Sequence, residues 1–207
     1  MASALADLVS RENSEEIAAF TVERQYIHDD LFQGRPLIPF ENISQLFPPS
    51  DFNMIIAVGY LKLNTVRAKK LEEAKNLGYE IRNYISPNCL IDRKMIVGEN
   101  SEIHEGAIMR GNIKLGSDVI ISAGVAIGHD ALIGSHSFIA AGVVTGGNIS
   151  IGDYCVIGLG AILRDGISIA AGTFIGAGAV VVSDIAEPGL YYGNPAKKQD
   201  KSPSDVV

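Results

Sequence analysis

The chain has 207 residues, which is enough for one or two domains, and 47% of them are hydrophobic, so a real core is expected. Its 24 acidic residues outnumber its 17 Lys and Arg residues, and the formal charge of −7 argues against nucleic acid and anionic membrane as partners. No secretory signal opens the sequence, and no uninterrupted apolar run reaches the ~18 residues of a membrane span, so we expect a cytoplasmic protein without a membrane span.

Residues 1–84 alternate helical and extended patterns, which predicts a small parallel α/β unit. The expected elements, in chain order, are a helical pattern over 5–19, a strand over 17–22, an extended piece over 36–40, a helical turn over 41–47, a buried strand over 52–58 and a helix over 64–77. Asn64 is the expected N-cap of the last helix, and Gly78 is its expected end.

From Ile85 to Ala186 an aliphatic residue recurs at every sixth position, and only Thr145 interrupts the series. The position four residues further on is small or aliphatic throughout. A helix has a period of about 3.6 residues and a strand a period of about two, so neither explains this pattern. We therefore predict stacked coils of 18 residues with three short strands each, in which the two recurring positions point inward and fill a narrow prism.

Both cysteines, Cys89 and Cys155, fall on inward positions of this pattern. They are 66 residues apart in the sequence, which corresponds to ~17 Å along the stack at the strand spacing. A disulfide cannot bridge that distance. We expect two buried free thiols, which suit a reducing cytoplasm.

The uninterrupted six-residue repeat resembles the left-handed β-helix of the hexapeptide-repeat acyltransferases, and the resemblance covers about half of the chain. It implies the left hand of the coil, which the period itself does not determine. It also places an acyltransferase β-helix at 85–186 and a C-terminal cap and tail at 187–207. The fold class is then mainly β, a left-handed parallel β-helix preceded by a small, incomplete Rossmann-like domain. A purely structural β-solenoid is the alternative.

Residues 1–84 resemble the amino-terminal domain of the sialic-acid-type sugar O-acyltransferases and of the related nucleotide-sugar N-acetyltransferases. In that family the domain begins with a strand and a glycine-rich turn that touches the nucleotide sugar. Here Met1 falls where that turn should lead into the first helix, so we expect a domain that lacks its first strand. The resemblance implies substrate contacts at Glu23, Gly59 and Tyr60. Strand-end turns without a ligand are the alternative.

Acyl transfer from a thioester needs a base that takes the proton of the attacking hydroxyl or amine, and an imidazole suits this task near neutral pH. His129 stands at or beside a corner of its hexad, and its neighbours 18 residues away are Gly111 and Gly147. Asp130 follows His129 and could orient it and stabilise the imidazolium. It could instead bond its own turn.

The family resemblance implies a choice among the four histidines. Sugar acetyltransferases of this kind carry a His-acid pair followed by a hexad that opens with Ile-Gly, which here reads His129-Asp130 and then Ile133-Gly134. The resemblance makes His129 the general base and Asp130 the residue that raises its basicity. His104, His136 and a solvated corner histidine are the alternatives.

The resemblance also implies a groove for acetyl-CoA as acyl donor. Its residues would be Phe138, Gly147, Leu159, Ala177 and Lys197. Phe138 takes the place of a second histidine that the family often has. Pro195, in the segment Gly193-Asn194-Pro195-Ala196-Lys197, ends the stacking of strands and covers the open end of the coil.

These resemblances predict an acetyl-CoA-dependent sugar O-acetyltransferase in surface polysaccharide or glycoconjugate biosynthesis, acting by direct transfer, without a metal, as a homotrimer. An N-acetyltransferase of a UDP- or dTDP-linked amino sugar is the alternative. A catalytically silent β-helix scaffold is a further alternative. A solenoid metal enzyme such as a carbonic anhydrase would need three histidines that meet, and His104 and His129 are out of register with the coil period.

Overall fold

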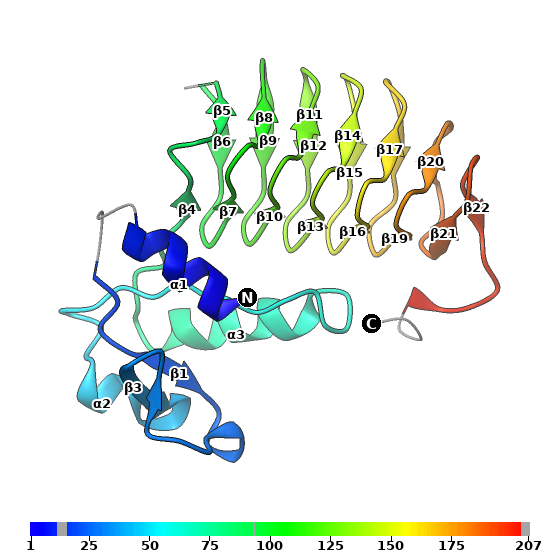
Figure 1. The fold of residues 1–207 in the computed structure, drawn as a ribbon. Coiled ribbons are helices and arrows are strands. Elements are labelled where there is room, and N and C mark those ends of the chain that lie inside the picture. The colour runs from blue at the N-terminus through cyan, green and yellow to red at the C-terminus, as the bar shows by residue number, and fades with distance from the viewer. Residues whose placement is uncertain (12–15, 93, 204–207) are drawn as a thin grey trace.

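The computed structural model describes residues 1–11, 16–92 and 94–203. Its main body is a parallel β-helix whose coils follow one another along one axis (Figure 1). Strands one coil apart pair in register, as Ile121 does with Ile103 on one side and with Ile139 on the other. The predicted six-residue side and 18-residue coil are therefore confirmed.

Three sheets form the three faces of the β-helix. The eight-stranded face consists of β4 (Tyr84–Ile85), β7 (Glu102–Ile103), β10 (Ile120–Ile121), β13 (Phe138–Ile139), β16 (Val156–Ile157), β19 (Phe174–Ile175), β21 (Leu190–Tyr192) and β22 (Lys197–Lys198). The six-stranded face consists of β5 (Leu90–Ile91), β8 (Ile108–Met109), β11 (Ala126–Ile127), β14 (Val144–Thr145), β17 (Ile162–Leu163) and β20 (Val180–Val181). The five-stranded face consists of β6 (Ile96–Val97), β9 (Ile113–Leu115), β12 (Ala131–Ile133), β15 (Ser150–Ile151) and β18 (Ser168–Ile169). Only β22 pairs antiparallel to its neighbour on these faces.

Each coil passes the eight-, six- and five-stranded faces in that order, so three edges run along the β-helix. The groove edge, between the eight- and six-stranded faces, carries Ser122, Ala141, Leu159 and Ala177. The histidine edge, between the six- and five-stranded faces, carries Gly111, His129 and Gly147. The third edge, between the five- and eight-stranded faces, carries Ser117, Ser135 and His136.

The two inward positions of each hexad fill the interior, as the sequence predicts. Ile103, Ile121, Ile139, Ile157 and Ile175 form one stacked column and are 0% exposed. Full burial of each such side chain stabilises the fold by about 1.5–3 kcal/mol. Stacked aliphatic side chains, together with backbone hydrogen bonds from coil to coil, therefore hold the β-helix together.

In residues 1–11 and 16–83, the region before the coils contains three helices and a small sheet. They are α1 (Ala2–Arg11), α2 (Ile43–Leu46), α3 (Thr65–Asn76), two 3₁₀ turns (Arg24–Tyr26 and Phe40–Asn42), and the strands β1 (Phe20–Val22), β2 (Leu31–Phe32) and β3 (Arg35–Pro39). The sheet has the order β1-β3-β2, with β1 parallel and β2 antiparallel to β3. Figure 1 shows α3 between this sheet and the coils. None of the helices in the described residues is long and apolar enough to cross a membrane.

Three local expectations for this region were wrong in detail. The described part of the first helix ends at Arg11, residues 12–15 lie outside the described residues, and 16–19 are neither helix nor strand. Residues 52–58 form one isolated bridge, Met54 to Ile81, rather than a strand. Asn64 is the N-cap residue of α3, as expected, but it is left-handed (φ 64°) and its side chain makes no cap bond. Its Nδ2 instead donates to the carbonyl of Cys155 at 3.3 Å, because contacts with the coils replace local capping.

A buried ion pair fastens α3 to the third edge. The side chains of Arg67 and Asp118 are both 0% exposed, and Arg67 Nε donates to Asp118 Oδ1 at 2.8 Å. Asn100 Nδ2 donates to the same Oδ1 at 2.7 Å, and Asn100 Oδ1 accepts the backbone N–H of Ile56 at 2.8 Å. A buried charge pair is tolerated when its remaining polar groups are bonded in this way. The network therefore fixes the position of the N-terminal region on the coils.

Candidate active site

His129 and Asp130 form a hydrogen-bonded pair at the corner between β11 and β12, on the histidine edge. The distance from His129 Nδ1 to Asp130 Oδ2 is 2.8 Å, and the two side chains are 71% and 54% exposed. An ionised carboxylate can only accept a hydrogen bond, so Nδ1 carries the proton. Nε2 of a neutral ring is then left as a proton acceptor, as a general base requires.

Two hydrogen bonds stabilise the ionised form of the Asp130 carboxyl. The bond with His129 and a second one with Asn112, one coil earlier, lower the pKa of the Asp130 carboxyl below its ordinary value of 3.8. The carboxylate is therefore ionised at neutral pH. The ionised carboxylate can orient the ring through Nδ1 and stabilise an imidazolium formed during a reaction.

The ring of His129 lies over Gly147, one coil further on. A Cβ added to Gly147 would lie 2.6 Å from His129 Nε2, and one added to Gly111 would lie 3.0 Å from His129 Cβ. No side chain fits at position 147 while the ring keeps this position. Gly147, expected from the family resemblance to line the coenzyme groove, is thus placed beneath the imidazole.

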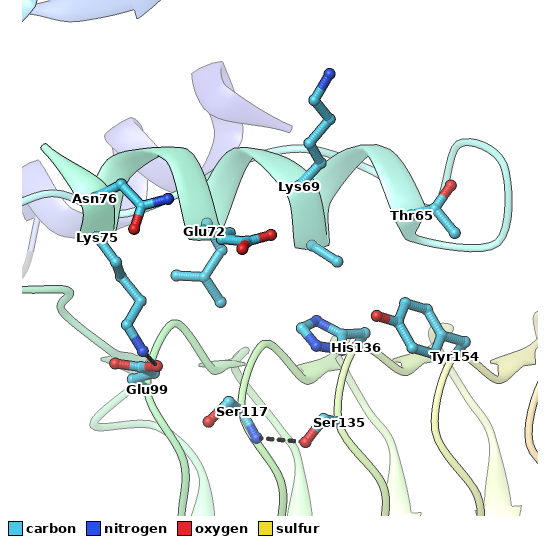
Figure 2. Close-up of a pocket in the computed structure, with 12 residues that line it drawn as sticks. Thr65, Lys69, Glu72, Lys75, Asn76, Glu99, Ser117, Ser135, His136 and Tyr154 are labelled. Carbon is cyan, nitrogen blue, oxygen red and sulfur yellow. Dashed lines mark hydrogen bonds and ion pairs between the residues drawn. The ribbon is translucent and has the colours of Figure 1, made fainter.

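His136 occupies a different environment on the third edge. Its Nδ1 lies 2.9 Å from Oδ2 of Asp118, which already binds Arg67, and its ring stacks on Tyr154 with centroids 4.7 Å apart. Figure 2 shows His136 and Tyr154 on the coils beneath α3, in a groove of about 620 Å³. His136 is therefore part of the network that attaches α3 to the coils.

His104 lies on the groove edge, where its Nε2 is 3.0 Å from Oε2 of the buried Glu102. The three histidines of the coils, His104, His129 and His136, thus stand at three different edges. Within residues 1–11, 16–92 and 94–203, no three His, Cys, Asp or Glu side chains form a group that could hold a metal ion.

An apolar groove of about 270 Å³ runs along the groove edge. Its lining includes Tyr60, Ser122, Phe138, Leu159, Phe174 and Ala177. Three of the residues predicted to bind the coenzyme, Phe138, Leu159 and Ala177, therefore lie together in one groove. The sequence analysis missed Ser122 and Phe174. Phe174 is two coil repeats after Phe138, so the 18-residue spacing was the signal that could have found it.

The three residues predicted to bind the substrate in the N-terminal region make different contacts. Glu23 accepts from Lys70 Nζ at 2.8 Å, and this hydrogen bond lowers the pKa of Glu23. Gly59 lies near the side chain of Met1. Tyr60 lines the apolar groove instead, with its ring centroid 4.8 Å from that of Phe138.

Lys197, the last of the predicted coenzyme residues, is exposed in β22, at the C-terminal end of the eight-stranded face. Tyr192 pairs with it across the strands. Lys198 beside it is bound to Glu187 at 2.7 Å. Lys197 therefore lies on the same face of the coil as Phe138, at the end of that face.

Comparisons with known proteins agree with the repeat and the fold. Residues 112–147 match the family described as bacterial transferase hexapeptide (six repeats). The acetyltransferase domain of PglB from Neisseria gonorrhoeae is 28% identical, with a TM-score of 0.86 over 95% of this chain and 94% of that chain, and it has also been solved with acetyl coenzyme A, with 93% of that chain covered. PerB from Caulobacter crescentus, solved with CoA and GDP-perosamine, is 26% identical, with a TM-score of 0.86 over 96% of this chain and 92% of that chain. No curated protein matches the sequence.

These findings confirm the resemblance to hexapeptide-repeat sugar acyltransferases that the repeat predicts, and with it the left-handed β-helix preceded by a small N-terminal region. They also confirm the expectation of an acyltransferase. Acetyl-CoA as the acyl donor agrees with the CoA and acetyl-CoA bound in the similar structures.

Proposed function

We propose that the protein transfers the acetyl group of acetyl-CoA to the amine of a nucleotide-linked amino sugar, with His129 as general base. The observation that carries the proposal is the exposed His129–Asp130 pair, with its ionised carboxylate on Nδ1 and its ring seated on Gly147. Such a pair can accept a proton at Nε2 while the thioester reacts beside it.

The reaction needs only this pair and a positioned thioester. The amine nitrogen attacks the thioester carbonyl, a C–N bond forms, and the C–S bond breaks. His129 takes the proton that the amine loses and returns it to the sulfur as CoA leaves as a thiol. Asp130 stabilises the imidazolium between the two steps. The thioester is already activated, so the step requires neither a metal nor a covalent enzyme intermediate.

A complete site on this proposal requires a second copy of the chain. His129 lies on the histidine edge, whereas Phe138, Leu159 and Ala177 lie in the groove of the groove edge. Both edges border the six-stranded face. If three copies turn their six-stranded faces toward a common threefold axis, the groove edge of each copy meets the histidine edge of the next.

The outer surface of the six-stranded face supports this assembly. Its outward column is aliphatic on every strand and consists of Leu90, Ile108, Ala126, Val144, Ile162 and Val180. Leu90, Val144 and Ile162 are 56%, 46% and 47% exposed in the single chain. A contiguous exposed apolar surface of this kind is typical of a protein–protein interface. We therefore propose the homotrimer that the sequence analysis expects.

The heights of the two edges are compatible with a shared site. A threefold axis parallel to the β-helix keeps each residue at its own level along the stack. The ring of His129 lies at the level of Gly147. Along the chain, and therefore along the stack, Gly147 falls between Ala140 and Gly158, which occupy the groove edge in two successive coils. The imidazole of one copy would then reach the middle of the groove of its neighbour, and Lys197 at the C-terminal end would meet the coenzyme phosphates.

An amine acceptor is supported by the similar structures. The relative from Caulobacter crescentus is a perosamine N-acetyltransferase whose structure holds GDP-perosamine. On this basis we favour the N-acetyltransferase alternative over the O-acetyltransferase that the sequence analysis placed first. The nucleotide would contact the N-terminal region near Glu23 and Gly59.

The test combines acetyl-CoA with GDP-perosamine, dTDP-4-amino-4,6-dideoxyglucose or free sialic acid, and it follows thiol release and product mass. An N-acetylated nucleotide sugar is the expected product. Acetylation of sialic acid alone would overturn the amine assignment. Absence of acetyl-CoA binding in calorimetry would favour the silent scaffold.

His129→Ala should lower kcat by about 100-fold or more while acetyl-CoA binding and the oligomeric state stay unchanged. His136→Ala is the matched control, because His136 lies on another edge and bonds to Asp118. Its kcat should stay near that of the wild type. Loss of activity in His136→Ala, with His129→Ala still active, would show that the base was assigned to the wrong imidazole.

A further inference from the structure

Tyr60 is the residue by which the N-terminal region enters the apolar groove. Its ring lies 4.8 Å from that of Phe138 and 6.5 Å from that of Phe174, and its side chain is part of the groove lining. The other lining residues all come from the coils. The N-terminal region therefore supplies one wall of the groove, and the β-helix supplies the rest.

The backbone that follows Tyr60 is held in an unusual conformation. Lys62, Leu63 and Asn64 have φ values of 49°, 50° and 64°, so three consecutive side-chain-bearing residues are left-handed. Such residues are disfavoured there by contacts between Cβ and the backbone. Strain of this kind persists only where surrounding contacts maintain it, and it is common at ligand-binding sites.

Contacts with the coils hold the left-handed residues Leu63 and Asn64 of this turn. Asn64 is 0% exposed and its Nδ2 bonds to the carbonyl of Cys155 in the β-helix. Leu63 packs on the cluster of Val156 and Phe174 that forms the floor of the groove. Tyr60, by contrast, remains 41% exposed as a residue. The turn is anchored, and the ring it presents to the groove is still available for a ligand.

The shape and chemistry of the groove favour an extended, largely apolar ligand. From Ser122 to Ala177 it spans about three coil spacings, or roughly 14 Å. Its polar side chains are those of Ser122 and Tyr60. A long apolar channel suits a chain of methylene and amide groups better than a compact pyranose with its many hydroxyls, which need hydrogen-bond partners when buried.

We infer that Tyr60 is a coenzyme-contacting residue: its ring packs against the pantetheine arm of acetyl-CoA and closes the groove from the side of the N-terminal region. This differs from the substrate contact that the family resemblance implies for position 60. The inference rests on the proposed function, in that it requires acetyl-CoA to lie in this groove. On this inference, a bound coenzyme contacts both the N-terminal region and the coils and so links the two parts of the chain.

The test measures coenzyme A binding by calorimetry, which needs no acceptor sugar and is therefore independent of the identity of the acceptor. Tyr60→Ala should weaken binding about ten-fold, and Tyr60→Phe, which keeps the ring, should stay within about two-fold of the wild type. Leu61→Ala is the matched control, because Leu61 lies in the same turn, is 58% exposed and is not part of the lining. It should bind like the wild type. Unchanged binding in a folded Tyr60→Ala, or an increase only in the KM of the acceptor, would overturn the inference.

Hydrogen exchange on the unmodified protein provides a second readout that no folding defect can obscure. Coenzyme A should slow amide exchange over residues 60–65, where the turn bonds Asn64 N–H to the carbonyl of Tyr60. Protection confined to the coils would refute the contact. Failure of the wild type to bind coenzyme A at all would instead refute the proposed function.

Discussion

Gly147 offers a way to displace the proposed base without touching its side chain. The structure places His129 Nε2 2.6 Å from the position of a Cβ at residue 147, whereas ordinary contact begins at 3.4 Å. Gly147→Ala therefore requires the ring to move by at least 3.4 − 2.6 = 0.8 Å. The imidazole is 71% exposed and can rotate away, so the cost to folding is small. Gly147 has no positive φ, so alanine brings no backbone strain.

The effect on catalysis should be much larger than the effect on stability. A displacement of about 1 Å of a catalytic group can cost about 100-fold in rate. We expect Gly147→Ala to lower kcat by about that factor, with the melting temperature and the affinity for acetyl-CoA nearly unchanged. The assays are steady-state kinetics with the acceptor that the wild type uses, thermal unfolding, and calorimetry.

A double-mutant cycle shows whether the effect passes through His129. In the His129→Ala background there is no ring to displace, so Gly147→Ala should cause no further loss of kcat. Full additivity of the two losses would mean that Gly147 acts directly, for instance on the coenzyme as the family resemblance implies. A single mutant with wild-type kcat would refute the reasoning, because the imidazole would then not need its observed position.

Three further outcomes are expected. Ile162→Asp places a charge on the aliphatic column of the six-stranded face and should give monomers in light scattering with loss of turnover; an active trimer would exclude that face as the interface. Arg67→Met leaves Asp118 buried without its cation and should lower the free energy of unfolding by about 3–5 kcal/mol in denaturant titration. Lys69→Met is the control, because Lys69 belongs to a surface ion pair, and it should change the free energy of unfolding by less than about 1 kcal/mol. Burial raises the pKa of the Cys155 thiol to about 11, so at pH 8 it stays protonated and should resist alkylation until the protein is unfolded, as mass spectrometry would show; rapid labelling of native Cys155 would contradict its position in the core.

The position of each residue in the coil could be predicted from the sequence because the six-residue repeat is a local pattern. Whether Ile121 points inward depends on its place within six residues, and its stacking partners follow at a fixed spacing. The same regularity indicated that His129 would stand at a corner between two glycines, and the structure shows it against Gly111 and Gly147. The N-terminal region has no such period. There the side chain of Asn64 bonds to the coils instead of capping α3, and residues 52–58 form only an isolated bridge to Ile81 instead of the expected strand.

By itself the sequence determined the coil, its 18-residue repeat and the level of each residue along the axis, because stacking in register converts sequence spacing directly into distance. Only the tertiary structure decided which residues share an edge. It separates His129 from Phe138, although they are nine residues apart in the chain, because a corner turns the backbone to another face. It also brings Tyr60 into the groove and Arg67 onto Asp118, since the docking of the N-terminal region depends on buried contacts between distant segments that no local pattern encodes.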